Sequence, residues 1–239
     1  MKKLFQKDEV WFAVLWIILY VVGFANADAI SESIGTPKLL TVPLGLLLSV
    51  IAYRFIRQSG LQAYFGLCPV QGGYDRFGYF LPLILISSVN FWNGVTVNCG
   101  ITETILYVVS MCLVGFLEEI IFRGFLFQGM CRTHVTSAII VSSLTFGVGH
   151  IINLLLGAPL FDTLLQLIYA SAIGFCYTAV FYVSGSILPC VLSHAVVNAT
   201  SIFAVEPDPS FSIVTTVVQT ILGVGYGLWL LHRHPKISK

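Results

Sequence analysis

Charged side chains are scarce in this chain of 239 residues. Asp, Glu, Lys and Arg make up 10% of it, whereas soluble domains carry about 25%. Apolar residues make up 57%. Because so few charges are available to cover a soluble surface, the composition predicts an integral membrane protein.

The chain also lacks an excess of either charge and any paired cysteines. The net charge of +1, without a basic and aromatic-rich patch, argues against a nucleic-acid partner. No CxxC pair is present, so neither a disulfide framework nor a cysteine metal site is indicated. The cysteines are scattered singly, and most lie in or beside apolar segments: Cys68, Cys99, Cys112, Cys131, Cys176 and Cys190.

Long apolar runs predict an all-α protein of about eight transmembrane helices, since each span needs about 20 mostly apolar residues. The first run has no obvious small-residue cleavage site before Asp28, so we expect it to be retained. We expect one integral membrane domain over residues 1–239. The predicted spans are 10–25, 39–56, 78–92, 101–128, 135–156, 164–183, 187–205 and 211–231.

Basic and acidic residues alternate between the loops that join these spans. With the N-terminus inside, the cytoplasmic segments collect most of the basic residues: Lys2, Lys3, Lys7, Arg54, Arg57, Arg76, Arg132, Arg233, Lys236 and Lys239. The outer segments hold Lys38 together with Asp28, Glu32, Glu103, Asp162, Glu206 and Asp208. The positive-inside rule therefore predicts that both termini are cytoplasmic.

Few strongly polar side chains remain inside the predicted spans, and each is costly there. A charged residue at the bilayer centre costs roughly 2.5–3.5 kcal/mol on insertion scales, and such residues mark functional sites by default. The polar residues at depth are Glu118, Glu119 and Arg123, then His150, and finally His194 and Asn198. We expect Glu118, His150, His194 and Asn198 to converge on one cavity.

Helical spacing divides the first three of these residues. Glu119 and Arg123 are four residues apart, so an α-helix places them on one face as an internal ion pair. Glu118 points about 100° away from Glu119 on such a helix. We therefore expect a structural role for Glu119 and Arg123, and a free carboxylate at Glu118. Phe146, four residues before His150, is predicted to be a core residue.

The four converging groups suit the activation of water and the stabilisation of an oxyanion. Glu118 would take a proton from water, with His150 orienting or sharing it, and His194 and Asn198 would hydrogen-bond the tetrahedral intermediate. An alternative makes Glu118, His150 and His194 ligands of zinc. The HExxH signature of zinc proteases is absent, and asparagine is an uncommon zinc ligand, so no cofactor is favoured and zinc stays open. A GxSG serine motif and a GxGD aspartyl motif are also absent.

Three ordered segments resemble a known family. They are "EEIIFRG" at 118–124, "FGVGH" at 146–150 and "HAVVN" at 194–198. They resemble the EExxxR, FxxxH and HxxxN motifs of the CPBP family, over a core of about 101–205. That family groups type II CAAX prenyl endopeptidases with Abi proteins, which process bacteriocins or confer immunity to them.

The resemblance implies an eight-helix intramembrane endopeptidase with Glu118 as the water-activating residue. It implies His150 as the partner of Glu118, and His194 with Asn198 as oxyanion or second-site ligands. Family members include enzymes described as metalloproteases and as glutamate proteases, which keeps the zinc alternative open.

We expect a protease that hydrolyses a peptide bond of a membrane-associated substrate, near the cytoplasmic side of the bilayer. The substrate would be a prenylated CAAX-type protein, a leader peptide or a bacteriocin-like peptide. The expected location is the cell membrane in a prokaryote and the endoplasmic reticulum in a eukaryote. The alternatives are a non-catalytic immunity or scaffold protein of the same fold and a transporter with a protonatable site, although no internal repeat supports transport.

Overall fold

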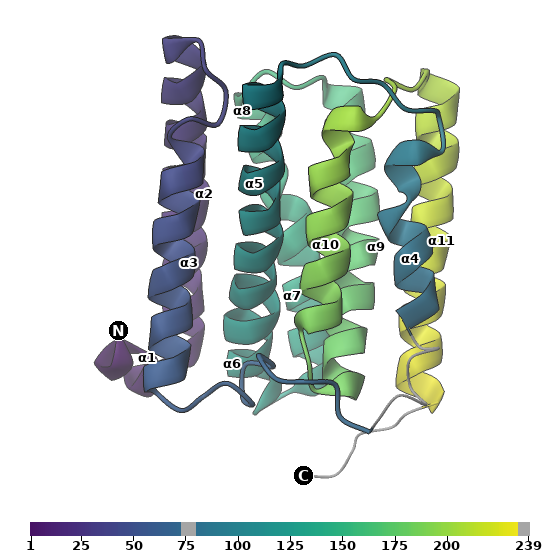
Figure 1. Cartoon of the computed structure of the whole chain (residues 1–239). Helices are drawn as coiled ribbons and strands as arrows, with labels where there is room; N and C mark the ends of the chain where they lie inside the picture. The colour runs from purple at the N-terminus through teal and green to yellow at the C-terminus, as the bar shows by residue number, and fades with distance from the viewer. Residues whose placement is uncertain (73–79, 234–239) are drawn as a thin grey trace.

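The computed structural model describes residues 1–72 and 80–233 of the chain. These residues form a bundle of helices that stand side by side with roughly parallel axes (Figure 1). Within the described ranges the only β-type pairing is an isolated bridge between Val95 and Ala204, and no strand forms. The all-α prediction is confirmed.

The first part of the chain forms two long helices and two short ones. Asp8 begins the first long helix, because its side chain accepts a hydrogen bond from the Trp11 amide at 2.9 Å. The elements are α1 (Lys2–Lys7), α2 (Glu9–Ile34), α3 (Thr41–Gln58), α4 (Leu81–Ser87) and η2, a 3₁₀ turn (Val89–Phe91).

The second part of the chain carries the segments that resemble the family motifs. Its elements are α5 (Ile101–Glu118), η3 (Glu119–Phe127), α6 (Gln128–Cys131), α7 (Val135–Gly149), α8 (Ile152–Leu155), α9 (Leu160–Ser184), α10 (Leu188–Thr200), η4 (Ser201–Phe203) and α11 (Pro209–Arg233). In the core of the bundle α9 packs against α7 and α11, and α5 packs against α3 and α10.

Five helical segments are long and apolar enough to cross a membrane: Glu9–Ile34, Ile101–Cys131, Val135–Leu155, Leu160–Ser184 and Pro209–Arg233. The last four agree with the predicted spans to within four residues at each end, whereas the first continues to Ile34, past the predicted end at residue 25. The predicted spans 39–56 and 187–205 coincide with α3 and with α10 plus η4, which are not among these five. The predicted span 78–92 begins outside the described residues. The chain is therefore a multi-pass membrane protein, and the total of eight spans stays a prediction.

The outer faces of the long helices are apolar. On α2, Trp11 is 61% exposed and Val22 is 55% exposed, and Ile221 on α11 is 66% exposed. A soluble protein rarely leaves so much contiguous apolar surface in water. These faces fit contact with lipid tails.

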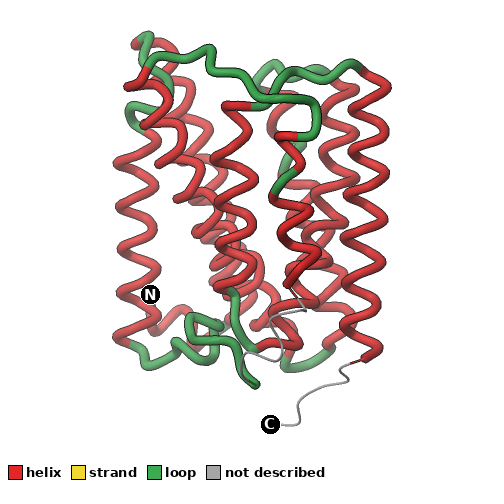
Figure 2. Tube along the Cα trace, turned by 45° about the vertical axis from the view of Figure 1, so that its right-hand side comes forward, coloured by secondary structure: helices red, strands yellow, loops and turns green. Residues whose placement is uncertain are grey.

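The loops gather at the two ends of the bundle (Figure 2). These two ends differ in the charged residues that they carry. The α1 segment and the last turn of α11 lie at the same end (Figure 1). That end, the termini end, also carries Arg57 at the close of α3 and Arg132 after α6. The opposite end, here the acidic end, carries Glu103, Asp162 and Glu206 beside the starts of α5, α9 and α11. This distribution agrees with the predicted loop charges, and the cytoplasmic location of the termini stays a prediction.

Aromatic side chains fill the bundle at the termini end. Phe12 contacts Phe55 and Phe125 with ring centroids 5.0 Å apart in both pairs, and Phe65 lies 5.1 Å from Phe125. Phe5 of α1 joins the same cluster, 5.5 Å from both Phe12 and Phe65. All of these pairs except the tilted Phe12–Phe55 pair are edge-to-face, and such close packing of rings fills the core at this end of the bundle.

At the same end a polar cluster joins the start of α2 to the segment after α3 and to the residue after α6. Glu9 accepts hydrogen bonds from Tyr64 at 2.5 Å and from Arg132 at 2.7 Å. Burial, and then the hydrogen bond to Glu9, raise the pKa of Tyr64 above its ordinary value, so its hydroxyl stays a donor at neutral pH.

One local feature departs from the predicted α-helix over 101–128. From Glu119 to Phe127 the backbone adopts a π-helix, η3, in which every residue is buried. A π-helix has wider turns than an α-helix and is often found at functional sites. The assumption of regular α-helical phase after Glu118 was therefore wrong.

Candidate active site

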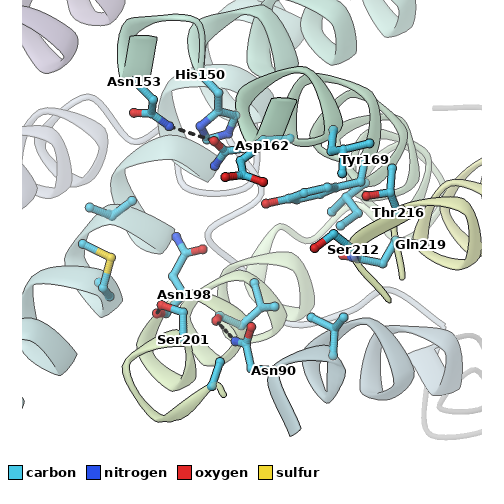
Figure 3. Close-up of a pocket in the computed structure, with 18 of the residues that line it drawn as sticks. Asn90, His150, Asn153, Asp162, Tyr169, Asn198, Ser201, Ser212, Thr216 and Gln219 are labelled. Atoms are coloured by element: carbon cyan, nitrogen blue, oxygen red, sulfur yellow. Dashed lines mark hydrogen bonds between the residues drawn. The ribbon is translucent and has the colours of Figure 1, made fainter. Parts of the chain in front are cut away.

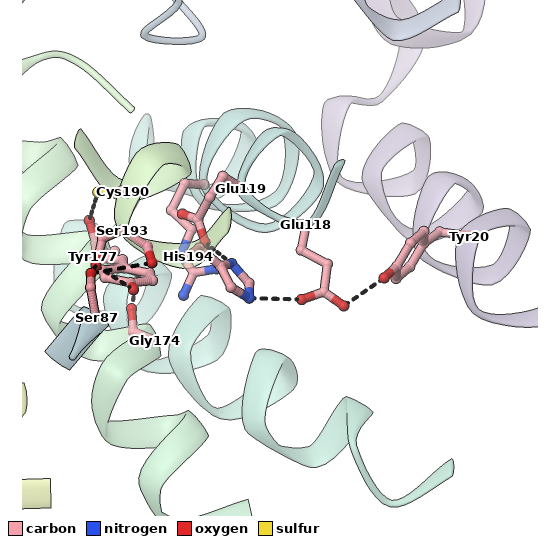
Figure 4. A network of polar contacts seen from close by, with 11 residues as sticks. Tyr20, Ser87, Glu118, Glu119, Gly174, Tyr177, Cys190, Ser193 and His194 are labelled. Atoms are coloured by element: carbon pink, nitrogen blue, oxygen red, sulfur yellow. Dashed lines mark hydrogen bonds and ion pairs between the residues drawn. The ribbon is translucent and has the colours of Figure 1, made fainter. Parts of the chain in front are cut away.

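The Glu118 carboxylate lies in the interior of the bundle between α2 and α10. Its Oε1 accepts a hydrogen bond from the Tyr20 hydroxyl at 2.7 Å, and Nε2 of His194 lies 3.4 Å from its Oε2 (Figure 4). Oε2 is buried and has no hydrogen-bond partner among the described residues. Tyr20 therefore holds one oxygen by a hydrogen bond, while the other lies beside His194 and keeps its capacity to accept one.

The neighbouring Glu119 forms a fully buried ion pair with Arg123. Arg123 Nη1 donates to Glu119 Oε1 at 3.0 Å, and both side chains are 0% exposed. His194 Nδ1 lies 2.9 Å from the same Glu119 oxygen (Figure 4). The imidazole ring of His194 therefore contacts both Glu118 and Glu119, although the two side chains were expected to point in different directions from the helix.

The Phe146 ring packs against three of the polar residues. The guanidinium carbon of Arg123 lies 4.2 Å from its centroid, which is a cation–π contact. The rings of His150 and His194 each lie 5.5 Å from it, in edge-to-face geometry. Phe146 is 4% exposed, so it is a core residue that also orients both histidines.

Two glycines let the helices approach closely enough to form these contacts. A Cβ at Gly115 would lie 2.7 Å from the Ala195 amide nitrogen, so α10 reaches α5 beside His194 only because this residue has no side chain. A Cβ at Gly174 would lie 3.0 Å from the Phe146 ring and 3.1 Å from Arg123 Nη2. The positions of the buried guanidinium and the imidazole thus depend on close helix packing.

A cavity of about 910 Å³ lies beside Glu118. Tyr20, Glu118, Phe146, His150 and Asn198 line it, and Figure 3 shows His150 and Asn198 among its side chains. Within the described chain no hydrogen bond uses the side chain of either His150 or Asn198. Three of the four residues expected to converge therefore share one cavity. His194 does not line it and lies behind Glu118, against Glu119.

The cavity extends from Glu118 toward the acidic end. The loop residues that line it, which include Lys38, Asn93, Pro159 and Glu206, belong to loops at that end. Two expectations from the sequence now conflict. If the termini are cytoplasmic, a substrate that enters through this mouth comes from the other side of the membrane, and not from the cytoplasmic side.

One segment of the chain matches a known protein family, and this segment carries most of the residues of the candidate site. Residues 100–200 match the Rce1-like family, described as type II CAAX prenyl endopeptidase Rce1-like. This match confirms the resemblance to the CPBP family that the three motifs indicated. No curated protein and no solved structure matches the chain.

The Rce1-like segment contains Glu118, His150, His194 and Asn198 and spans nearly the same residues as the predicted core. The coarse prediction of an intramembrane protease family is thereby supported, while the role of each residue stays a prediction. Tyr20 lies outside the segment, on α2.

None of the three motifs includes Tyr20, but the spacing of aromatic residues on α2 could have predicted that Tyr20 faces the interior. Phe12, Trp16, Tyr20 and Phe24 recur every four residues, and all four are buried. This pattern marks the inward face of the first helix. It places a single hydroxyl on an otherwise apolar stripe.

The zinc alternative requires that Glu118, His150 and His194 come together. Among residues 1–72 and 80–233, no group of three or more His, Cys, Asp or Glu side chains is placed to hold a metal ion. A protein zinc site takes at least three such ligands. The described side-chain positions do not form that site, and the expectation that no cofactor is favoured, with zinc as the open alternative, is left to metal analysis.

Proposed function

We propose that the protein is an intramembrane endopeptidase in which Glu118 activates water for attack on a peptide bond. One observation carries the proposal. Glu118 is a buried carboxylate that lines the same cavity as His150 and Asn198, and its Oε2 forms no hydrogen bond among the described residues. A carboxylate that is held on one oxygen and has no hydrogen bond on the other can still accept a proton, which suits a general base.

Each residue then has a role that follows from its position. Glu118 takes a proton from water, the water oxygen bonds to the carbonyl carbon, and the proton later passes to the leaving amine as the C–N bond breaks. His150 orients the water, and the Asn198 amide donates a hydrogen bond to the oxyanion. His194 acts as a positioning residue, because its contacts are with Glu118 and Glu119 behind the cavity.

The substrate is a membrane-associated peptide or protein. The name of the Rce1-like family points to prenylated CAAX-type proteins. Leader peptides and bacteriocin-like peptides are the other candidates within the proposal. All share an extended peptide that reaches an active site below the membrane surface.

Hydrolysis by the purified full-length protein tests this function. We expect it to cleave a prenylated CAAX peptide or an unmodified leader-type peptide in H₂¹⁸O, with one ¹⁸O in the new carboxylate by mass spectrometry. We expect cleavage to survive a chelator. Stoichiometric zinc that is lost together with activity would replace the glutamate mechanism with a metal-dependent one. Cleavage of neither peptide would favour the non-catalytic alternative.

The Tyr20 contact provides a separate prediction. Tyr20→Phe removes the hydroxyl that holds Glu118 Oε1 but keeps the buried ring. Because a hydrogen bond to a charged group contributes about 1.5–3 kcal/mol, we expect kcat to fall about tenfold or more, with little change in KM. Steady-state kinetics on a cleaved peptide measures both constants.

Tyr107→Phe is the matched control. Tyr107 lines the same cavity, and its hydroxyl pairs with Ser201 at 2.8 Å and not with Glu118. We expect nearly unchanged kcat for this variant. An equal fall in kcat for both variants, or no fall for Tyr20→Phe, would argue against a positioning role for Tyr20.

A further inference from the structure

The acidic end of the cavity carries carboxylates without a basic partner. Asp162 and Glu206 both line the cavity and are exposed, and neither forms an ion pair within the described part of the chain. Lys38 is the one Lys or Arg among the described lining residues, and it is bound to Asp28 at 2.8 Å. The mouth therefore presents negative charge to whatever enters.

A second and independent feature lies deeper, on α11. Ser212, Thr216 and Gln219 line the cavity at spacings of four and three residues, so they share one face of the helix (Figure 3). Gln219 is 5% exposed, and no hydrogen bond in residues 1–72 and 80–233 uses its side chain. A buried amide that faces a cavity without a partner can both donate to and accept from a peptide backbone.

These two features define a path that an extended peptide can follow. From Ile101 at the acidic end to Glu118, helix α5 rises about 25 Å. An extended chain covers that length in about seven or eight residues. A residue held at the mouth is therefore several positions away from the bond that meets Glu118.

We propose that the substrate is a peptide segment with a basic residue that binds Asp162 and Glu206 at the mouth, while Gln219 hydrogen-bonds its backbone. This inference rests on the proposed function, because it assumes that the bond to be cleaved reaches Glu118. The α11 residues and Glu206 lie outside the Rce1-like segment. They set the specificity of this chain, whereas Glu118 supplies the chemistry.

Binding and cleavage of matched peptides test the inference on the full-length protein in nanodiscs. The probes are internally quenched peptides of about ten residues, which is long enough to span the cavity. Each carries Lys, Gln or Glu at a single position, and that position is moved along the peptide from one set of probes to the next. Binding is measured by fluorescence anisotropy on the Glu118→Gln variant, and cleavage on the wild type. We expect the Lys peptide to bind about fivefold more tightly than the Gln peptide, with the Glu peptide weakest. The preference should be largest about six to eight positions from the cleaved bond.

The double variant Asp162→Asn/Glu206→Gln should remove the preference for lysine without changing binding of the Gln peptide. The double variant Glu32→Gln/Glu103→Gln is the matched control, since these acids lie at the same end but do not line the cavity. It should keep the preference. Gln219→Leu should weaken binding of all three peptides about fivefold or more, because it removes a backbone contact.

Unchanged lysine preference in Asp162→Asn/Glu206→Gln, or an absence of preference in the parent protein, would overturn the inference. Unchanged binding in Gln219→Leu would overturn its backbone contact. Cleavage by the wild type without any charge dependence contradicts this inference alone. Charge-dependent binding without cleavage contradicts the proposed function alone.

Discussion

Glu118→Gln is expected to abolish peptide cleavage. The amide keeps the size of the side chain and can still accept the Tyr20 hydrogen bond, but it cannot take a proton from water. General-base catalysis typically contributes 10²–10⁴-fold, so we expect kcat to fall at least about 10³-fold. The measurement is single-turnover cleavage of a peptide that the wild type hydrolyses, with thermal unfolding in the same detergent to check the fold.

Glu119→Gln is the informative comparison for Glu118→Gln, because it makes the same substitution at the neighbouring acid. A change at another cavity residue, such as Asn90, would disturb α10, since the Asn90 amide donates a hydrogen bond to Thr200 at 2.9 Å. The Glu119 carboxylate lies behind the cavity with Arg123 and His194, so we expect lower stability and expression before any specific loss of kcat. Wild-type cleavage by Glu118→Gln would reject the catalytic assignment.

Arg123→Leu is expected to cause the largest loss of stability. It leaves the Glu119 carboxylate, which is 0% exposed, without its guanidinium, and it removes the cation–π contacts with Phe146 and Tyr177. Breaking a buried ion pair by removing one partner costs about 3–5 kcal/mol. Reversible unfolding of the purified protein in mixed micelles measures the free energy of unfolding.

The double variant Glu119→Gln/Arg123→Leu separates buried charge from lost packing. If the cost comes from an unpaired carboxylate, neutralising Glu119 should recover part of the stability, because a buried pair is often replaceable by uncharged groups. A double variant that is less stable than Arg123→Leu would contradict this explanation. It would instead indicate that Glu119 is needed mainly for its contact with His194.

Several features of the fold could be predicted from local patterns. The bounds of four of the five long apolar helices follow the hydropathy of the chain, because a span of that length must be apolar to enter the bilayer; α2 continues past its apolar run to Ile34. The Glu119–Arg123 pair also forms at the predicted spacing, because residues four apart on a helix are neighbours whatever surrounds them.

The environment of His194 could not be predicted in the same way. Its position in "HAVVN" places it on one face of α10, but the partners of that face depend on how α10 packs against α5. The close approach at Gly115 brings the ring to both acids at once. Helical phase alone had separated Glu118 from Glu119, and η3 shows that the phase itself changes at Glu119.

The sequence by itself determined the membrane class, the helical segments and the set of polar residues worth examining, because hydropathy and residue spacing act along the chain. Only the tertiary structure decided that Tyr20 holds Glu118, that His194 lies behind the cavity and that the cavity extends toward the acidic end. The physical reason is that these relations join segments far apart in sequence. The packing of the buried helix faces sets the distances between these side chains. Among the described residues a tightly packed aromatic core fills the termini end, and the cavity beside Glu118 extends toward the other end.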